Sequence, residues 1–259
     1  MGNAESDSWI RVYREAPDGV RLFCFPHAGG AAGYYYPWSR MLPGNIEVLA
    51  LQYPGRQDRR DEPCVRTIPE LADQIHAAIR PWLTEPFAFF GHSMGAVLAF
   101  EVASRIERED GTGPAHLFVS GRRAPALFKH EELHRATTSV FLAEVDALGG
   151  MDPRVLADRE LLDLILPTIR ADYAAIETYR FASTPPLACD ITALSGDDDP
   201  KAAIPEVAAW AQHTLGRFQL RLFPGGHFYL DQCRSAVLDV VSSGLASVRP
   251  GLRQDAGRA

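Results

Sequence analysis

The amino-acid sequence predicts an α/β fold, with a mainly parallel central sheet that helices cover on both faces. Along most of the 259 residues, short apolar runs of strand length alternate with segments of helical periodicity. Near the middle, the apolar run 87–90 stops abruptly at Gly-His-Ser-Met-Gly, and a helical segment at 96–103 follows it. This order of strand, tight turn and helix is typical of an open parallel sheet whose functional side chains gather at the carboxyl ends of the strands.

The first half of the chain consists of predicted strands and helices in turn. Residues 9–13 indicate an edge strand, and the run 21–25 indicates a stronger strand that leads into a loop of small residues. The predicted elements that follow are a helix over 34–42, a buried strand over 46–51, a helix that begins at the capping box of Thr67 and Glu70, and the strand over 87–90.

The second half differs, because strand patterns vanish between about residues 124 and 186. Helical periodicity takes over there, between a strand predicted at 116–120 and another predicted at 191–194. We expect this block to be a helical insertion into a single domain that spans residues 1–259. The remaining predicted elements are a helix over 204–213, a strand over 218–222 and a last helix from Tyr229 to about Ala246.

Charge and composition argue against several classes of partner. The formal net charge is −7, which disfavours nucleic acid or an anionic membrane as a main partner. No apolar run approaches the roughly 18 residues of a membrane-spanning helix, and the N-terminal residues lack the apolar core of a signal peptide. The four cysteines have no paired spacing, so we expect free thiols in a reduced, cytoplasmic protein, with a monomer favoured.

The sequence gives no sign of a bound metal or cofactor. No cluster of His, Cys and Asp residues has metal-site spacing, and no glycine-rich loop has the phosphate-binding pattern. We therefore expect neither group. His27 and His92 flank the predicted site, and we expect them to be packing groups beside it.

Ser93 stands at the centre of the pentapeptide from Gly91 to Gly95, which has the pattern of a nucleophile elbow. In such an elbow the serine is held in a strained backbone conformation, and glycines two residues away on either side prevent collisions. The pentapeptide alone is weak evidence, because a chain with 21 glycines can contain it by chance. Its position between a predicted strand and a predicted helix makes the prediction more specific.

A serine hydroxyl needs a base within hydrogen-bond reach, and the base needs a third group that fixes its tautomer. Asp199 follows one predicted strand, and His227 follows the next. Either residue alone would be an ordinary residue of a solvated turn. The chain order Ser93, Asp199, His227 is that of a catalytic triad on the α/β-hydrolase fold, so we predict that these side chains meet at one edge of the sheet.

The loop after the strand at 21–25 consists mainly of small residues. In acyl transfer on this fold, such a loop supplies one backbone N–H to the oxyanion of the tetrahedral intermediate. We assign the N–H groups of Ala28 and Met94 to this oxyanion hole. A plain flexible turn at residues 28–30 is the alternative interpretation.

Six motifs together resemble the type II thioesterases, the stand-alone editing enzymes of polyketide and nonribosomal peptide synthetases. These motifs are Phe-Pro-His-Ala-Gly-Gly at 25–30, Gln-Tyr-Pro-Gly-Arg at 52–56, Gly-His-Ser-Met-Gly at 91–95, Ser-Gly-Arg-Arg-Ala-Pro at 120–125, Gly-Asp-Asp-Asp-Pro at 196–200 and Gly-Gly-His-Phe at 225–228. They extend over nearly the whole chain, which makes the set far more specific than the elbow alone.

The resemblance implies hydrolysis of acyl thioesters on the phosphopantetheine arm of acyl or peptidyl carrier proteins, which releases aberrant or stalled acyl units. It implies that Ser93 is the nucleophile, His227 the general base and then acid, and Asp199 the orienting carboxylate. The family pattern Gly-Asp-x-Asp-Pro favours Asp199 over Asp197 and Asp198. The helical insertion would then be a mobile lid over the acyl pocket, and the phosphopantetheine would come with the partner.

Two other functions fit the fold and the triad. One is a general serine esterase, lipase or peptidase, because fold and triad do not define the leaving group. The other is a catalytically silent, hydrolase-like binding protein, which the presence of every required group disfavours.

Two groups of arginines follow predicted strands and should lie near the site. Arg56, Arg59 and Arg60 form the first group, and Arg122 and Arg123 form the second. They either contact a pantetheine phosphate or an acidic carrier protein, or they form a solvated, salt-bridged rim. Acidic residues next to the first group favour the rim.

Overall fold

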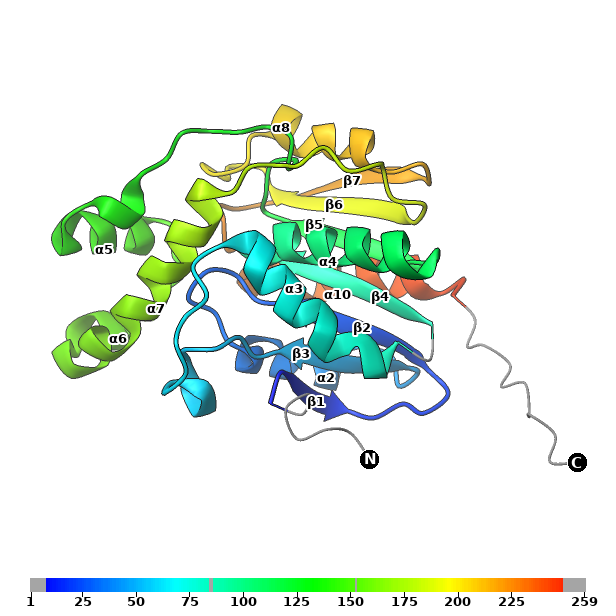
Figure 1. Ribbon diagram of the computed structural model, residues 1–259, viewed down its shortest axis with the longest axis horizontal. Helices are drawn as coiled ribbons and strands as arrows, with labels where there is room; N and C mark the ends of the chain where they lie inside the picture. The colour runs from blue at the N-terminus through cyan, green and yellow to red at the C-terminus, as the bar shows by residue number, and fades with distance from the viewer. Residues whose placement is uncertain (1–7, 84–85, 152, 249–259) are drawn as a thin grey trace, which may run out of the picture.

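The computed structural model describes residues 8–83, 86–151 and 153–248, and within these ranges seven strands form one sheet (Figure 1). The order across the sheet is β1-β3-β2-β4-β5-β6-β7. β1 is antiparallel to β3, and all other neighbours are parallel, so the predicted mainly parallel sheet with an edge strand is confirmed. The strands are β1 (Ile10–Arg14), β2 (Val20–Phe25), β3 (Ile46–Leu51), β4 (Phe87–His92), β5 (His116–Ser120), β6 (Asp190–Gly196) and β7 (Phe218–Phe223).

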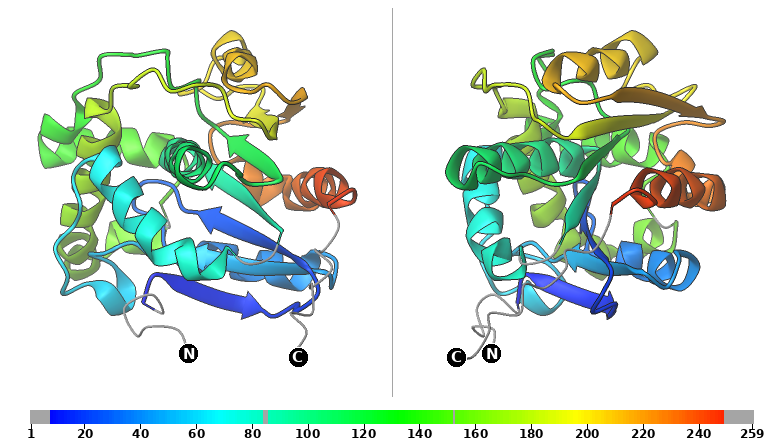
Figure 2. Two further views of the ribbon diagram at one scale, coloured as in Figure 1. Left: turned by 45° about the vertical axis from the view of Figure 1, so that its right-hand side comes forward. Right: turned by 90° about the vertical axis from the view of Figure 1, so that its right-hand side faces the viewer.

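Helices cover both faces of this sheet, as predicted (Figure 2). Helices α3 (Ile68–Ile79) and α4 (Met94–Asp110) lie on one face, and α2 (Tyr36–Met41) and α10 (Arg234–Leu245) lie on the other. Among the described residues, no helix is both long enough and apolar enough to cross a bilayer. The shorter elements are α8 (Ile204–Ala208), α9 (Tyr229–Gln232) and the 3-10 helices η1 (Ala32–Tyr35), η2 (Gln57–Arg59), η3 (Arg80–Trp82), η4 (Leu133–Arg135) and η5 (Ala209–His213).

Strand β4 shows why the sheet has an apolar core on each face. Successive side chains of a strand point to opposite faces. Phe89 therefore packs in the core with α3 and α4, and Phe90 packs in the core with α2 and α10. A strand that is buried on both faces has a continuous run of apolar residues in its sequence, and the run at 87–90 is the pattern that predicts this strand.

In the described part of the chain, three α-helices and the 3-10 helix η4 separate β5 from β6, where the sequence predicts a helical insertion. The α-helices are α5 (Thr138–Ala147), α6 (Pro153–Ala157) and α7 (Arg159–Thr178), and they lie beyond one end of the sheet, on the left of Figure 1. Helix α7 contains Pro167, and its buried residues all follow this proline. The single domain predicted over residues 1–259 extends past the described ranges and stays a prediction.

The last predicted helix differs from the structure. It was expected to be continuous from Tyr229 to about Ala246, but α9 ends at Gln232 and α10 begins at Arg234. Cys233 between them has φ −100° and ψ 20°, which interrupts the α-helix. The spacing of apolar residues does not reveal this break. When a single residue leaves the helical conformation, the apolar residues on either side keep almost the same spacing. Similarly, the helix predicted over 204–213 is α-helical only as far as Ala208.

Candidate active site

Ser93 lies at the turn between the end of β4 and the start of α4. Its backbone has φ 55° and ψ −116°, a left-handed conformation that costs a residue with a side chain on the order of 1–3 kcal/mol. Both glycines of the pentapeptide are required for steric reasons. A β-carbon on Gly91 would overlap the carbonyl oxygen of Gly95, and one on Gly95 would overlap that of Phe25. The predicted strained elbow is therefore present.

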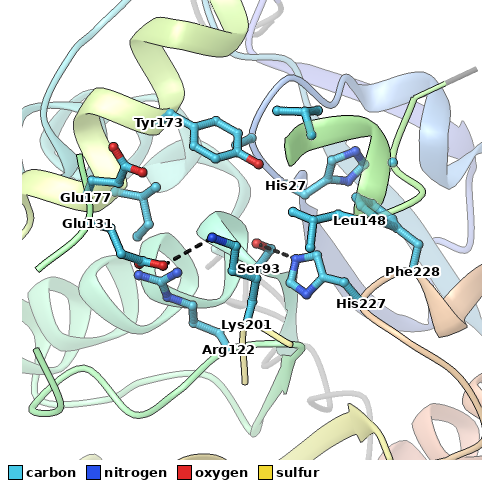
Figure 3. Close-up of a pocket in the computed structure, with 14 residues that line it drawn as sticks. His27, Ser93, Arg122, Glu131, Leu148, Tyr173, Glu177, Lys201, His227 and Phe228 are labelled. Carbon is cyan, nitrogen blue, oxygen red and sulfur yellow. Dashed lines mark hydrogen bonds and ion pairs between the residues drawn. The ribbon is translucent and has the colours of Figure 1, made fainter. Parts of the chain in front are cut away.

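The side chains of the predicted triad meet at the carboxyl ends of β4, β6 and β7. His227 Nε2 lies 3.0 Å from Ser93 Oγ (Figure 3), and His227 Nδ1 lies 2.9 Å from Asp199 Oδ2. His227 is 4% exposed and Asp199 is 7% exposed. Burial in a medium of low dielectric strengthens the attraction between an imidazolium and this carboxylate. The Asp199 carboxylate is therefore placed to stabilise a positive charge on the His227 ring.

The structure distinguishes the three consecutive aspartates. Asp197 Oδ1 accepts a hydrogen bond of 3.0 Å from the Gly225 N–H, and the Asp198 side chain is exposed. Of the three, Asp199 is the one whose carboxylate reaches His227. Its Oδ1 also accepts a hydrogen bond of 2.8 Å from the Lys201 N–H, which helps to fix the orientation of the carboxylate.

Ala28 and Met94, the predicted oxyanion-hole residues, both lie beside Ser93. Met94 is the first residue of α4, so its N–H has no acceptor within the helix. Ala28 lines the same cavity as Ser93 and His227. Within the described ranges, neither N–H donates to a protein acceptor, whereas the Gly29 N–H donates to Asp172 Oδ2 at 2.7 Å. These two amides are thus available to an oxygen atom of a ligand.

The cavity beside Ser93 has a volume of about 50 Å³ and is lined from two sides (Figure 3). Loops at the end of the sheet contribute His27, Ala28, Ser93, His227 and Phe228. The segment between β5 and β6 contributes Val145, Leu148, Gly150, Tyr173, Ile176 and Glu177. The insertion therefore covers the serine that the sequence singles out.

Charged side chains form part of the cavity wall. Burial, together with the charge of Arg123, lowers the pKa of Arg122 to about 10. Glu131 lies 2.5 Å from Arg123 Nη2 and 3.2 Å from Lys201 Nζ. Burial raises the pKa of Glu131, but these two cations outweigh it and hold the pKa at about 2. The sequence places the two arginines near the site but does not single out Glu131 or Lys201, because nothing local marks their pairing.

The arginines after β3 form ion pairs within the protein. Arg56 pairs with Asp172 at 2.8 Å and Arg59 with Glu62 at 2.5 Å, and both arginines are buried. Arg60 is exposed. For Arg56 and Arg59 the structure supports the salt-bridged alternative rather than contact with a phosphate. The sequence reasoning missed Asp172, which lies 116 residues from Arg56 and carries no motif of its own.

His27 and His92 are buried packing groups beside the triad, as predicted. His92 Nδ1 lies 2.9 Å from Ser120 Oγ, and its ring centroid lies 5.1 Å from that of His227. Burial lowers the pKa of His27 to about 3 and also lowers that of His92, so both rings are neutral near pH 7. In the part of the chain that the structure describes, no group of three or more His, Cys, Asp or Glu residues could hold a metal ion.

The elbow, the hydrogen-bonded triad side chains and the parallel sheet that carries them define a serine hydrolase of the α/β-hydrolase fold. A family model described as the thioesterase domain matches residues 20–244. The chain belongs to this family, as a type II thioesterase of polyketide or nonribosomal peptide pathways.

Several known proteins are similar to this chain over more than nine-tenths of its length. Thioesterase PikA5 of Streptomyces venezuelae is 48% identical over 249 residues, which cover 95% of this chain and 89% of PikA5. The type II thioesterase BorB from the borrelidin biosynthetic cluster has a structure that matches with a TM-score of 0.87 and 46% identity, over 94% of this chain and 100% of BorB. YbtT, a type II thioesterase from the yersiniabactin NRPS/PKS biosynthetic pathway, matches with a TM-score of 0.82 and 28% identity, over 92% of this chain and 98% of YbtT. These similarities confirm the fold and the family that the motifs indicate.

Proposed function

We propose that this protein hydrolyses acyl thioesters on the phosphopantetheine arm of acyl or peptidyl carrier proteins, and so removes aberrant or stalled acyl units from a synthetase. One observation carries the catalytic part of this proposal: Ser93 Oγ lies 3.0 Å from His227 Nε2, in a cavity that the insertion covers. Membership of the thioesterase family supports the thioester as the bond that is cleaved.

In the first half of the proposed reaction, the acyl group moves to the enzyme. Ser93 Oγ attacks the thioester carbonyl while His227 Nε2 accepts the serine proton. The N–H groups of Ala28 and Met94 donate to the oxyanion that forms. The tetrahedral intermediate then collapses, the carbon–sulfur bond breaks, and His227 returns the proton to the departing thiolate of the pantetheine arm.

In the second half, water releases the acyl group. His227 accepts a proton from the water molecule as it attacks the Ser93 ester, and the same two amides hold the second oxyanion. Collapse of this intermediate breaks the ester bond, and His227 gives the proton back to Ser93 Oγ. Throughout both halves, Asp199 holds the imidazole in the tautomer that keeps Nε2 free to accept a proton.

The proposed partners are carrier-protein domains of a polyketide or nonribosomal peptide synthetase. YbtT, which comes from an NRPS/PKS pathway, is among the proteins that support this inference. The phosphopantetheine arm arrives covalently attached to the partner, and side chains supply the acid–base chemistry, so we infer that the enzyme has no cofactor of its own. All four cysteines are free thiols, as is usual in a reducing compartment, and we infer that the protein works in the cytoplasm. That the protein is a monomer stays a prediction.

A comparison of two substrates tests this function. One is a carrier protein loaded with an acyl group, and the other is a simple oxygen ester of the same acyl group. We expect a higher kcat/KM with the loaded carrier protein, measured from the mass of the phosphopantetheine arm. A preference for the simple ester, with no release of the acyl group from the carrier protein, would identify a general esterase instead. If the protein hydrolyses neither substrate, it is a binding protein.

A further inference from the structure

A buried carboxylate of the insertion contacts the loop that follows β2. Asp172 lies in the inner half of α7 and is 1% exposed. Its Oδ2 accepts a hydrogen bond of 2.7 Å from the Gly29 N–H and another of 2.8 Å from Arg56 Nη1, and its Oδ1 accepts one of 2.9 Å from Arg56 Nη2. Gly29 directly follows Ala28, whose N–H is a proposed oxyanion donor. The insertion thus reaches the loop that is expected to stabilise the transition state.

Arg56 holds the same loop from a second direction. Its Nη1 also donates a hydrogen bond of 2.9 Å to the Gly30 carbonyl oxygen. Burial alone would lower the pKa of Arg56, but the Asp172 carboxylate outweighs it and raises the pKa, so the guanidinium stays charged. Asp172 therefore accepts a hydrogen bond from an N–H of the loop, and Arg56 donates one to a carbonyl oxygen of the loop. A bidentate ion pair joins the two side chains.

Packing between the loop and α7 is equally close. Gly29 has a φ of 76°, and a β-carbon at this position would lie 2.8 Å from Ile169 Cγ1. Thr168 directly precedes Ile169 in α7, and its Oγ1 donates a hydrogen bond of 2.6 Å to the Gly55 carbonyl oxygen. The inner half of α7 is thus attached by polar and apolar contacts to the two loops that follow β2 and β3.

We propose that Asp172 is a positioning residue for the oxyanion hole. It fixes the Gly29 N–H, in the peptide unit that follows the one carrying the Ala28 N–H, and so directs the Ala28 N–H at the oxyanion only while the inner half of α7 is seated on the loop. The inference rests on the proposed function, because it assigns Asp172 an effect on the reaction at Ser93. A purely structural ion pair would affect stability and leave the chemical step unchanged.

The test compares Asp172→Asn with a matched control, Glu101→Gln. Glu101 is also a buried carboxylate in an ion pair, with Arg105 at 2.6 Å, and it accepts a hydrogen bond of 2.6 Å from the hydroxyl group of Tyr179 at the end of α7. It anchors the same helix but does not contact the oxyanion loop. A second variant, Arg56→Lys, keeps the positive charge and loses the bidentate contact, so it extends the test if Asp172→Asn is poorly folded.

The assays measure the midpoint of urea unfolding, kcat and KM for an acyl N-acetylcysteamine thioester, and the affinity for an acyl trifluoromethyl ketone. Ser93 Oγ adds to the carbonyl carbon of this ketone. The resulting adduct carries an oxyanion, as the tetrahedral intermediate of the reaction does. For Asp172→Asn we expect kcat to fall roughly 10- to 100-fold with KM within about twofold of the wild-type value, and ketone affinity to fall by the same factor as kcat. We expect a smaller fall in kcat for Arg56→Lys, and for Glu101→Gln a lower unfolding midpoint with an unchanged kcat.

Equal kcat values for Asp172→Asn and Glu101→Gln, or a change confined to KM, would overturn the positioning role. So would a ketone affinity that does not follow kcat. Failure of the proposed function has a different signature, because the wild-type protein itself would then leave the thioester intact.

Discussion

The α-carbon of Gly95 in α4 lies directly against the carbonyl oxygen of Phe25 at the end of β2, with no space for a β-carbon between them. This contact brings the elbow and the loop with Ala28 together, so one substitution tests how closely they must approach. We expect Gly95→Ala to lower the free energy of unfolding by about 3 kcal/mol, because the methyl group forces the helix and the strand end apart. Urea unfolding measures this loss, and activity should fall with it.

Gly44→Ala is the control for this prediction. Apart from the glycine itself and its two neighbours in the chain, no heavy atom lies within 4 Å of the position that its β-carbon would take. We expect the free energy of unfolding to stay within about 0.5 kcal/mol of the wild-type value. If both alanine variants have wild-type stability and activity, the elbow does not require the small residue that the structure indicates.

Asp199 should be the aspartate on which turnover depends. Both of its carboxylate oxygens lie within 3.0 Å of His227 Nδ1. Asp199→Asn leaves the shape unchanged but favours the wrong tautomer of His227, and we expect kcat to fall roughly 10³- to 10⁴-fold. Asp198→Asn changes an exposed side chain and should retain full kcat. A larger loss in Asp198→Asn than in Asp199→Asn would contradict the assignment.

The buried His116 should make the protein less stable in mild acid. It is 6% exposed, stacks on Phe118 at 4.1 Å, and its Nε2 lies 2.8 Å from Thr192 Oγ1. Burial lowers its pKa to about 4, whereas the unfolded chain has a His pKa of about 6.5. Between these values the unfolded state binds more protons, so the free energy of unfolding falls as the pH falls from about 6.5 to about 4.

Replacing this ring tests the acid effect. In His116→Gln we expect the fall in the free energy of unfolding across this pH window to shrink, by an amount on the order of 3 kcal/mol. Urea unfolding at several pH values gives the two curves. His130→Gln, which changes an exposed side chain, should leave the curve unchanged. Parallel curves for His116→Gln and the wild-type protein would show that His116 does not cause the pH dependence.

Helix α7 should differ in stability on the two sides of Pro167. The proline cannot donate the backbone hydrogen bond that the helix requires at that position. On its N-terminal side Leu161 and Leu164 are exposed, whereas Thr168 and Asp172 on the other side are buried. We expect amides of residues 160–166 to exchange hydrogen at least roughly tenfold faster than those of residues 169–177, because the side chains of the first half are at most partly buried.

Hydrogen exchange followed by mass spectrometry measures this difference, with the buried helix α4 as the protected reference. Fast exchange in the first half alone would show that this half of the helix opens independently of the half that is seated on the loops. Uniform protection along α7 would contradict a boundary at Pro167.

The sequence predicts those parts of the fold and site that local patterns encode. The inner strands of the sheet are short, mainly apolar runs, and Ser93 and His227 occur in motifs with glycines that tight turns require. These patterns need only neighbouring residues, so they are readable without a structure. The chain order of Ser93, Asp199 and His227 then follows from the fold class.

Contacts between distant segments could not be predicted in this way. The pair of Arg56 and Asp172 joins the loop after β3 to helix α7 across 116 residues of sequence, and nothing near either residue marks the other. The contact of Glu131 with Lys201 at the cavity could not be predicted either. Their segments follow β5 and β6, and they come together only when these two strands pair in the sheet. The break at Cys233 was missed because one residue outside the helical region leaves the apolar pattern almost unchanged.

The role of Ser93 is the central claim, and the rate at which Ser93→Ala clears an acyl-loaded carrier protein tests it most directly. The substitution removes only the hydroxyl group that lies 3.0 Å from His227 Nε2. We predict that release of the acyl group, followed by the mass of the phosphopantetheine arm, falls by roughly 10⁴-fold or more, with no loss of folding. Clearing within tenfold of the wild-type rate would show that the acyl group does not pass through Ser93.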